Sequence, residues 1–453
     1  MVELLELWKR IESGPTSSEM EFTLLLSKEL AKLQKEYEIR YDPENLVPLD
    51  KNLAQNIFDA AVKLLSDVGI LYVTSGNIIK FSEAEIFESL KNSVNRLFIG
   101  EGRESVELVT RKVGDKRRPL IGGGPCACPV SEELYTQTLY SYAKENVDLV
   151  ADGFVKSFNG LPANKGSPLE MAAVRLEAAL SREAIRRAGR PGLCLLGPMS
   201  GISAVALSEA DFEGGIRHSD IHDVAPLNEL KIDLDVFNRL MHNQQHGNIF
   251  EVAQCPLHGL LGGAEATAIV SSAEILADLL LGGTITGTSP SSVKFSTGTS
   301  RETLWVAGMA AASIKGVAQP IINSWIWAGA GPCTEMLCYE IAALTVLETL
   351  SGFDMIISAG GTKGGLPDHY TGMEARVASE VSRAACKLSL NDAQKVTKDI
   401  LALYEKMLIE KRIPEGKSFT ECYSLNSATP SQEYLGIWHK AKTKLGEVGL
   451  KFE

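Results

Sequence analysis

The sequence predicts a (β/α)8 barrel that is flanked by helical segments. From Pro119 to about Leu388, short apolar runs that end in Gly, Pro, Cys or Ser alternate with longer segments of helical periodicity. This alternation is the pattern of βα units. Eight such runs occupy roughly 270 residues, which is close to the ~250 residues of a typical barrel of this kind.

The expected strands are recognised by their apolar character and by the turn residues at their ends. They are PLIGGG from Pro119, VDLVADGF from Val147, LCLLGP from Leu193, IRHSDIHDV from Ile216, NIFEVAQCP from Asn248, TITGTS from Thr284, INSWIWAG from Ile322 and MIISAGG from Met355. Two helices between them are expected to begin with capping boxes. These are Ser167 with Glu170 and Thr299 with Glu302, pairs in which each side chain bonds the backbone N–H of the other residue.

The region before the barrel, residues 1–117, is expected to form an N-terminal helical cap. The run from Lys51 to Leu65 has helical spacing. Ser82 and Glu85 form a further capping box ahead of a second helical run. These signals favour helices throughout the region.

The remaining boundaries follow from the same reading. The barrel is assigned to residues 118–388, and the tail to residues 389–453. The tail carries an apolar stripe at helical spacing, made of Leu401, Tyr404, Met407 and Leu408. We therefore expect the tail to be a C-terminal helical extension.

The composition is that of a globular protein with a large core, since 45% of the residues are hydrophobic and 23% are charged. The formal net charge of −12 opposes nonspecific binding to nucleic acid and to anionic membranes. The dense basic run from Arg111 to Arg118 lacks interleaved aromatic residues and is interpreted as a solvated loop. Charges interrupt the apolar residues of the N-terminus, and the eight cysteines are scattered, so we expect a cytoplasmic protein with reduced thiols.

A barrel of this type places its chemistry at the C-terminal ends of its strands. The candidate site residues are therefore those at the predicted strand ends. They are Cys126 and Cys128 after the first strand, Leu196 on the third, His222 and Asp223 on the fourth, Ala253, Cys255 and His258 around the fifth, and Trp325 and Trp327 on the seventh.

The fourth run carries five ionisable groups within the seven residues from Arg217 to Asp223. Such groups are costly to bury unpaired in a barrel strand. A functional site is one reading of the run, because perturbed charges concentrate at active sites, and a structural ion-pair network is the other. The run also approaches the loop by which B12-binding domains offer a histidine to cobalt, but it ends in Ala225 where that loop has Gly. No doubly wound domain follows, so no internal cobalamin is expected.

Trp325 and Trp327 lie two residues apart on one strand and point to the same face. They form either packed barrel core or a ligand wall, since tryptophan faces attract cations as well as methyl groups. Cys126, Cys128, Cys255 and His258, with His222 nearby, could instead assemble a zinc site, although their spacing is no established signature and buried cysteine is usually a small apolar residue.

Several short segments at consistent spacing give the chain a recognisable likeness. They are GRPG from Gly189, LNELKIDLD from Leu227, RETL from Arg301, AGPCTEM from Ala330, TGMEAR from Thr371, LYEK from Leu403 and ECY from Glu421. In these segments the chain resembles the monomethylamine methyltransferases of methanogenic archaea over nearly its whole length. The resemblance implies a TIM barrel, a homo-oligomer, and transfer of a methyl group to Co(I) of a corrinoid that a separate small protein carries. It implies no permanently bound cofactor.

The chain departs from this family at the site itself. The family has a pyrrolysine just before a Gly-Pro pair, where this sequence has Leu196. Asp223 and Ala253 stand where the family has glutamates, and Trp325 and Trp327 where it has a glutamine and a tyrosine. Leucine cannot supply the electrophile that pyrrolysine provides, so the resemblance implies a pocket suited to something other than methylamine.

These exchanges favour a quaternary or tertiary methylated amine as the methyl donor. Tryptophan faces hold a fixed cation. Asp223 would balance its charge, and His222 would orient Asp223 or contact the corrinoid. Two alternatives stay open: the same transfer from a methyl thioether, ether or thiol, with zinc on Cys126 and Cys128, or a noncatalytic relic that only docks the corrinoid protein.

Overall fold

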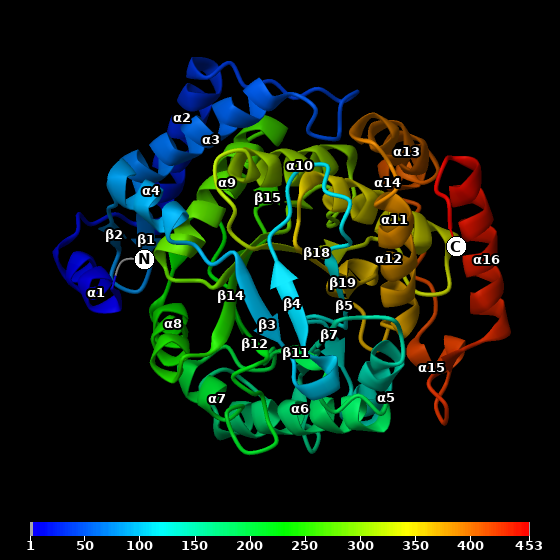
Figure 1. Ribbon diagram of the computed structural model, residues 1–453. Coiled ribbons are helices and arrows are strands. Elements are labelled where there is room, and N and C mark those ends of the chain that lie inside the picture. The colour runs from blue at the N-terminus through cyan, green and yellow to red at the C-terminus, as the bar shows by residue number, and fades with distance from the viewer. Residues whose placement is uncertain (1–2, 453) are drawn as a thin grey trace.

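A computed structural model describes residues 3–452 of the chain. Within these residues, eight parallel strands close into a barrel in chain order (Figure 1). They are β5 (Leu120–Gly123), β7 (Leu149–Ala151), β11 (Cys194–Gly197), β12 (Ile221–Val224), β14 (Ile249–Gln254), β16 (Ile285–Thr288), β18 (Ile322–Trp327) and β19 (Met355–Gly360). The last strand pairs with the first, so the predicted barrel is confirmed.

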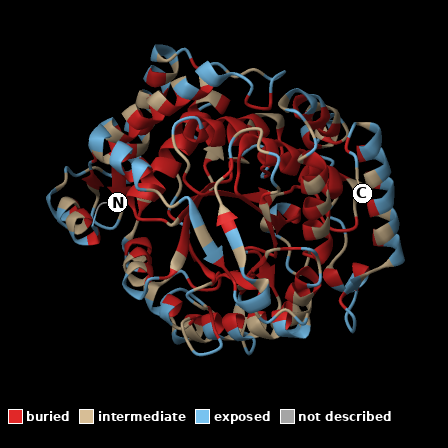
Figure 2. Cartoon of the chain, in the orientation of Figure 1, coloured by how far each residue is buried: buried red, intermediate tan, exposed pale blue. Residues whose placement is uncertain are grey.

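Each barrel strand is followed by a helix that packs on the outside of the barrel. The helices are α5 (Glu132–Ala143), α6 (Pro168–Arg187), α7 (Ala204–Ser208), α8 (Leu234–His246), α9 (Ala264–Leu280), α10 (Arg301–Lys315), α11 (Glu335–Ser351) and α12 (Gly372–Ala385). Figure 2 shows that α9, α10 and α11 are buried on nearly every side, because further helices cover them.

The two capping boxes expected inside the barrel region do not form as predicted. Ser167 does cap α6 by accepting from the N–H of Glu170, but the Glu170 carboxylate bonds Ser203 and nearby backbone N–H groups instead. Helix α10 is capped by Ser300, while the Thr299 hydroxyl donates to buried Glu340. Tertiary partners outcompeted the local capping geometry in both places.

The first 117 residues contain helices and two hairpins, so the expectation of a wholly helical cap is incomplete. The helices are α1 (Leu4–Ser13), α2 (Glu19–Glu36), α3 (Lys51–Val68) and α4 (Glu83–Lys91), and the strands are β1 (Ile70–Tyr72), β2 (Asn77–Ile79), β3 (Arg96–Ile99) and β4 (Val106–Val109). The capping box of Ser82 and Glu85 is present at α4. Strand β1 also pairs with β13 (Lys231–Ile232), which joins this region to the barrel.

The β3–β4 hairpin covers the N-terminal end of the barrel (Figure 1). The N–H of Gly100 donates to the carbonyl of Ser219, and the N–H of Ile321 donates to that of Val94. Ile99 and Leu108 of the hairpin are buried against the lower part of the barrel interior. Because this end is closed, the opposite, C-terminal end is the one through which a ligand can enter.

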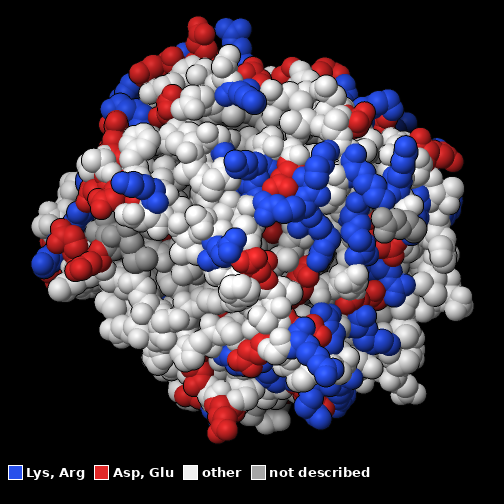
Figure 3. Space-filling view, viewed as in Figure 1, with Lys and Arg blue, Asp and Glu red and all other residues white. Residues whose placement is uncertain are grey.

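The basic run from Arg111 to Arg118 follows β4 on this closed face, where Figure 3 shows many basic side chains. Lys116 and Arg117 are exposed there, as expected of a solvated loop. Arg111 is not: its side chain is buried, and it donates to the carbonyls of Phe353 and Thr349. That arginine is therefore a structural residue that ties the loop to the end of α11.

The chain after the barrel packs against α11, as predicted for a helical extension. It forms α13 (Leu390–Ala402), α14 (Glu405–Ile409), α15 (Phe419–Cys422) and α16 (Gln432–Glu447), with a short hairpin of β20 (Tyr423–Ser424) and β21 (Thr429–Pro430). Helices α13 and α16 both contact α11. The exact limits of the three regions stay a prediction. None of the helices among the described residues has the length and apolar character needed to cross a membrane.

Candidate active site

The interior of the barrel holds a buried apolar cluster that is separate from the core between barrel and helices. Leu196, Ala253 and Trp325 belong to this cluster, and Trp327 packs against it. These are the four residues that the sequence assigned to substrate binding. They come from β11, β14 and β18, so barrel closure brings residues from across 130 positions of the chain to one place, as the sequence predicts.

Leu196 occupies the wall of this interior near the C-terminal end of β11. Its register partners are Ala151 on β7 and Ile221 on β12, and its side chain is fully buried. The next residue, Gly197, has no room for a side chain, because a Cβ there would lie 2.3 Å from the Asp152 carboxylate. Leu196 is thus fixed in an apolar setting without a reactive group of its own.

The two tryptophans form an angled aromatic wall. Their ring centroids are 6.4 Å apart and the ring planes are inclined by 79°. Ile326, between them, lies in the outer core, as strand alternation requires. Trp325 is buried, and Trp327 is only partly buried at the end of the strand. The indole N–H of Trp325 has no hydrogen-bond partner among the described residues, so a buried donor stays available.

Asp223 on β12 does not stand alone, because Glu251 on β14 is its register partner. Burial raises the pKa of both carboxyl groups, and their mutual repulsion raises that of Glu251 further. Two negative charges on neighbouring buried carboxyl groups repel each other, so the doubly ionised state of this pair is disfavoured. Ionisation of Asp223 therefore opposes ionisation of Glu251.

Glu251 is held from the other side by Asn323 on β18, whose amide donates to Oε2 of the carboxylate. A glycine makes this contact possible: a Cβ at Gly287 of β16 would lie 1.8 Å from the side-chain oxygen Oδ1 of Asn323. Glu251 is not among the predicted site residues, although it lies in a predicted strand two positions before Ala253. Residues two apart on a strand point to the same face, so the inward position predicted for Ala253 also indicates an inward position for Glu251.

Arg239 of α8 provides the positive charge beside this carboxyl pair. Its guanidinium donates to the backbone carbonyl of Asp223 and lies 3.5 Å from Oδ2 of the same residue. Both side chains are about 6% exposed. The other oxygen of Asp223, Oδ1, has no hydrogen-bond donor within the part of the chain that the structure describes. Arg239 thus contacts Asp223 but not Glu251, so the pair carries more carboxyl groups than contacting cations among the described residues.

His222 lies on the other side of the barrel wall, so the expectation that it orients Asp223 or meets the corrinoid is not supported. Its Nε2 contacts the carbonyl of Arg217, and its Nδ1 lies 3.4 Å from the side-chain amide of Asn248. The side chain is fully buried, and burial lowers its pKa to about 4, so the ring is neutral at neutral pH. Adjacent strand residues point to opposite faces, and Asp223 takes the inner one.

The charged run before β12 contains both a structural ion-pair network and a residue of the barrel interior, the two alternatives that the sequence left open. The strand begins at Ile221, so Arg217 and His218 lie in the preceding loop rather than in the barrel wall. Asp220 is fully buried and bonded by Arg217 and by Arg182 of α6. This part of the run is a structural ion-pair network, and Asp223 alone reaches the barrel interior.

The thiols and His258 do not converge on one point. Cys126 belongs to the cluster of the barrel interior, whereas Cys128 belongs to the core between barrel and helices. Burial raises the pKa of Cys128 and of Cys255 to about 12, which keeps both as thiols. Among the described residues, the group of three or more donors close enough to share a metal is a different one, Asp211 with His242 and His246.

Comparison with known proteins places the chain. The sequence profile of the family described as "Monomethylamine methyltransferase MtmB" matches residues 2–450. The chain belongs to the monomethylamine methyltransferase family. Monomethylamine methyltransferase MtmB1 of Methanosarcina acetivorans is 34% identical over 451 residues, which are 99% of this chain and 98% of that protein. Monomethylamine methyltransferase MtmB of Methanosarcina mazei is equally similar.

The likeness extends to the three-dimensional structure. The crystal structure of monomethylamine methyltransferase MtmB from Methanosarcina barkeri matches with a TM-score of 0.96 and 32% sequence identity, over 99% of this chain and 98% of that one. A hydroxylamine complex of MtmB matches equally well. The monomethylamine methyltransferase family therefore supplies both the fold and the methyltransferase class, while the barrel interior of this member is lined by Leu196, Trp325 and Trp327.

Proposed function

We propose that this protein transfers a methyl group from a cationic methylated amine, quaternary or tertiary, to the corrinoid of a separate protein, and does so without pyrrolysine. The observation that carries the proposal is the composition of the barrel interior. Two tryptophans and Leu196 lie in one apolar cluster, and the carboxyl pair of Asp223 and Glu251 lies beside it. Tryptophan faces next to a carboxyl pair are suited to bind a methylated cation.

The aromatic wall supplies the attraction for the cation. A quaternary ammonium over the face of a tryptophan gains ~0.5–2 kcal/mol, and more where water is excluded. The inclined rings of Trp325 and Trp327 offer two faces to one ligand. Their apolar neighbours Leu196 and Ala253 suit the methyl groups of the same ligand.

The carboxyl pair supplies the countercharge. In the free protein the pair of Asp223 and Glu251 holds a proton, because burial and repulsion disfavour two negative charges. A bound cation favours the doubly ionised pair and so lowers the pKa of the pair. Binding of a cation is therefore expected to release a proton, and the affinity should rise with pH.

The replacement of an electrophile by Leu196 is consistent with such a donor. A quaternary ammonium already carries the positive charge that makes its nitrogen a leaving group, and it departs as a neutral amine that needs no proton. The protein then has to hold the methyl carbon in line for transfer, a positioning effect that alone can lower a barrier by several kcal/mol. Leu196, Trp325 and Trp327 are placed to limit the orientations of the donor.

The C-terminal end of the barrel is the side on which the partner's corrinoid has to approach, because the β3–β4 hairpin closes the other end. The corrinoid supplies the Co(I) nucleophile that accepts the methyl group. Of the two tryptophans, Trp327 lies nearer to that opening, because it is at the end of β18 and partly exposed. It can contact both the donor and the approaching partner.

The proposal is tested with a panel of methyl donors and a corrinoid protein reduced to Co(I). Monomethylamine, trimethylamine and tetramethylammonium form the series, and dimethyl sulfide is the neutral donor. Corrinoid methylation is followed by its absorbance change. Faster transfer from trimethylamine or tetramethylammonium than from monomethylamine supports the proposal. Transfer from monomethylamine or dimethyl sulfide alone, or no transfer from any donor, contradicts it, and the last result would favour a docking role.

A further inference from the structure

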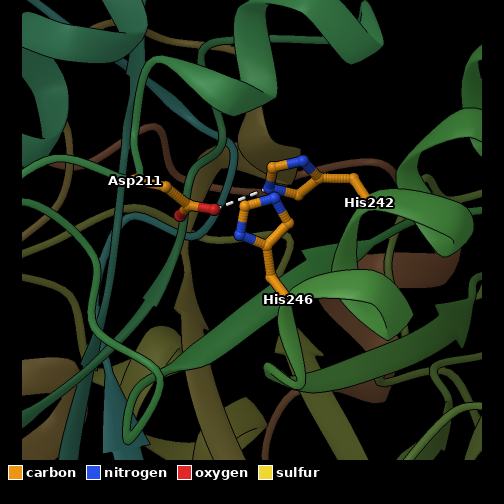
Figure 4. A group of neighbouring side chains, drawn as sticks. All are labelled: Asp211, His242 and His246. Carbon is orange, nitrogen blue, oxygen red and sulfur yellow. Dashed lines mark hydrogen bonds and ion pairs between the residues drawn. The ribbon is translucent and has the colours of Figure 1, made fainter.

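We propose that Asp211, His242 and His246 form a binding site for a divalent transition metal of the zinc class, on the outer side of the barrel wall. Figure 4 shows the three side chains together, with Asp211 reaching from a loop toward two imidazoles on α8. One donor atom from each residue lies within 4.8 Å of the others. The proposed methyl transfer does not use these residues, so this inference stands apart from it.

The helix arranges the two histidines. His242 and His246 are four residues apart on α8, so they lie one turn apart on the same face. Their rings are stacked, with centroids 4.3 Å apart and planes inclined by 27°. Two imidazoles in this arrangement present nitrogen donors to the same point, as helix-borne histidine pairs do at metal sites.

Asp211 provides the third donor from a different element. It lies in the segment between α7 and β12, and its Oδ2 is 2.6 Å from Nε2 of His242. Its other oxygen, Oδ1, is buried and has no hydrogen-bond partner within the described residues. The nearby ring of His222 does not satisfy it, because Nδ1 of that ring is 3.7 Å away and faces the Asn248 amide. One oxygen of the Asp211 carboxylate therefore contacts the histidine pair, and the other is buried without a hydrogen-bond partner among the described residues.

The donor set selects the kind of ion. Two imidazole nitrogens and one carboxylate suit zinc and its neighbours, whereas calcium and magnesium prefer oxygen donors throughout. Because zinc holds each such donor at about 2.0–2.2 Å from the ion, the donors around it lie farther apart than the 2.6 Å between Oδ2 of Asp211 and Nε2 of His242, so this hydrogen bond must give way to the ion. His246 is exposed, and its side chain has room to rotate toward the ion. Three protein donors leave a fourth position for water.

A metal at this place would tie the segment around Asp211 to α8. That segment leads into Arg217 and Asp220, whose ion pairs fix the start of β12. Metal binding is therefore expected to stabilise the fold, since a ligand that binds only the folded state raises the melting temperature.

Zinc titration of the metal-free protein by calorimetry, together with a thermal unfolding assay, tests the inference. The wild type should bind one zinc ion per chain and melt at a higher temperature with zinc. His246→Ala should weaken binding at least tenfold and abolish the thermal shift, and because the residue is exposed, its loss should not unfold the protein. Asp211→Asn, which keeps a hydrogen-bond partner for His242, should act in the same way.

The matched control is His439→Ala, which removes an exposed histidine from α16. Cobalt(II) provides a second readout, because a thiolate charge-transfer band would reveal binding at half-buried Cys255 or Cys386 instead. The inference is overturned if the wild type binds no zinc, if His439→Ala weakens binding as much as His246→Ala, or if the thiolate band appears.

Discussion

Two aspartates three residues apart, Asp220 and Asp223, show how one charged run serves two regions of the molecule. Asp220 lies at the start of β12 and accepts hydrogen bonds from Arg182, Arg217 and the N–H of Leu195. Asp223 lies on the inner face of the same strand beside Glu251, and its contact with Arg239 is 3.5 Å long and leaves its Oδ1 without a partner among the described residues. The first aspartate is satisfied by its surroundings and the second is not. A buried aspartate with enough cations and hydrogen-bond donors around it stabilises the fold, whereas one with too few of them is available for a ligand.

The largest effect is expected from Asp220→Asn. The substitution leaves Arg182 and Arg217 partly unpaired at a buried site, which should lower the free energy of unfolding by about 3 kcal/mol. Denaturant unfolding measures this loss. Binding of a methylated cation should change little in the folded fraction, because Asp220 lies outside the barrel interior. A large loss of cation affinity with unchanged stability would erase the distinction between the two aspartates.

Asp223→Asn should have the opposite profile. Removing the charge should weaken binding of choline by about 2 kcal/mol, or roughly thirtyfold, because the cation loses its countercharge. The neutral isostere 3,3-dimethylbutan-1-ol should bind the variant almost as well as it binds the wild type. His222→Gln, one position away but on the outer face, is the matched control and should leave both affinities unchanged. Equal losses for choline and its isostere would show that Asp223 is a packing residue.

Trp327→Gln should give a smaller effect of the same kind, about 1 kcal/mol against the cation, since one of two aromatic faces is lost. Trp325 remains as the second face, and the partly exposed position of Trp327 limits the damage to packing. Calorimetry with choline and its isostere separates the two contributions. If the isostere lost as much affinity as choline, the wall would act by shape alone.

The smallest effect concerns pH. Because the pKa values of Asp223 and Glu251 are raised in the folded state, the pair contributes most to stability at low pH, and this contribution is lost as the pH rises from the unfolded value of about 4. Glu251→Gln should therefore be stabilised relative to the wild type at pH 8 more than at pH 5. The affinity of the wild type for choline should rise over the same interval, with proton release seen in buffers of different ionisation enthalpy. A pH-independent affinity would argue that the pair stays protonated when the cation binds.

The difference between the two faces of β12 also explains why the predicted role of His222 differs from the structure, as does the predicted start of the strand. The strand was expected from Ile216, which would have placed Arg217 and His218 in the barrel wall, but the structure begins it at Ile221. His222 and Asp223 were both predicted to act at the end of this strand, although strand alternation sends neighbours to opposite faces. Their proximity in the sequence suggested one site, but the pleat of the strand places Asp223 inside the barrel and His222 outside it.

The sequence by itself determined the barrel and placed the four residues predicted to bind substrate on its strands, because periodic apolar runs and turn residues are local properties of the chain. The closure of β19 on β5, which brings Leu196 and the two tryptophans together, follows once the strands are counted. The tertiary structure decided the partners: Glu251 beside Asp223, Arg239 between helix and strand, and Asp211 against α8. These contacts join residues from different elements, and the register that sets them depends on packing of the whole barrel rather than on any local pattern.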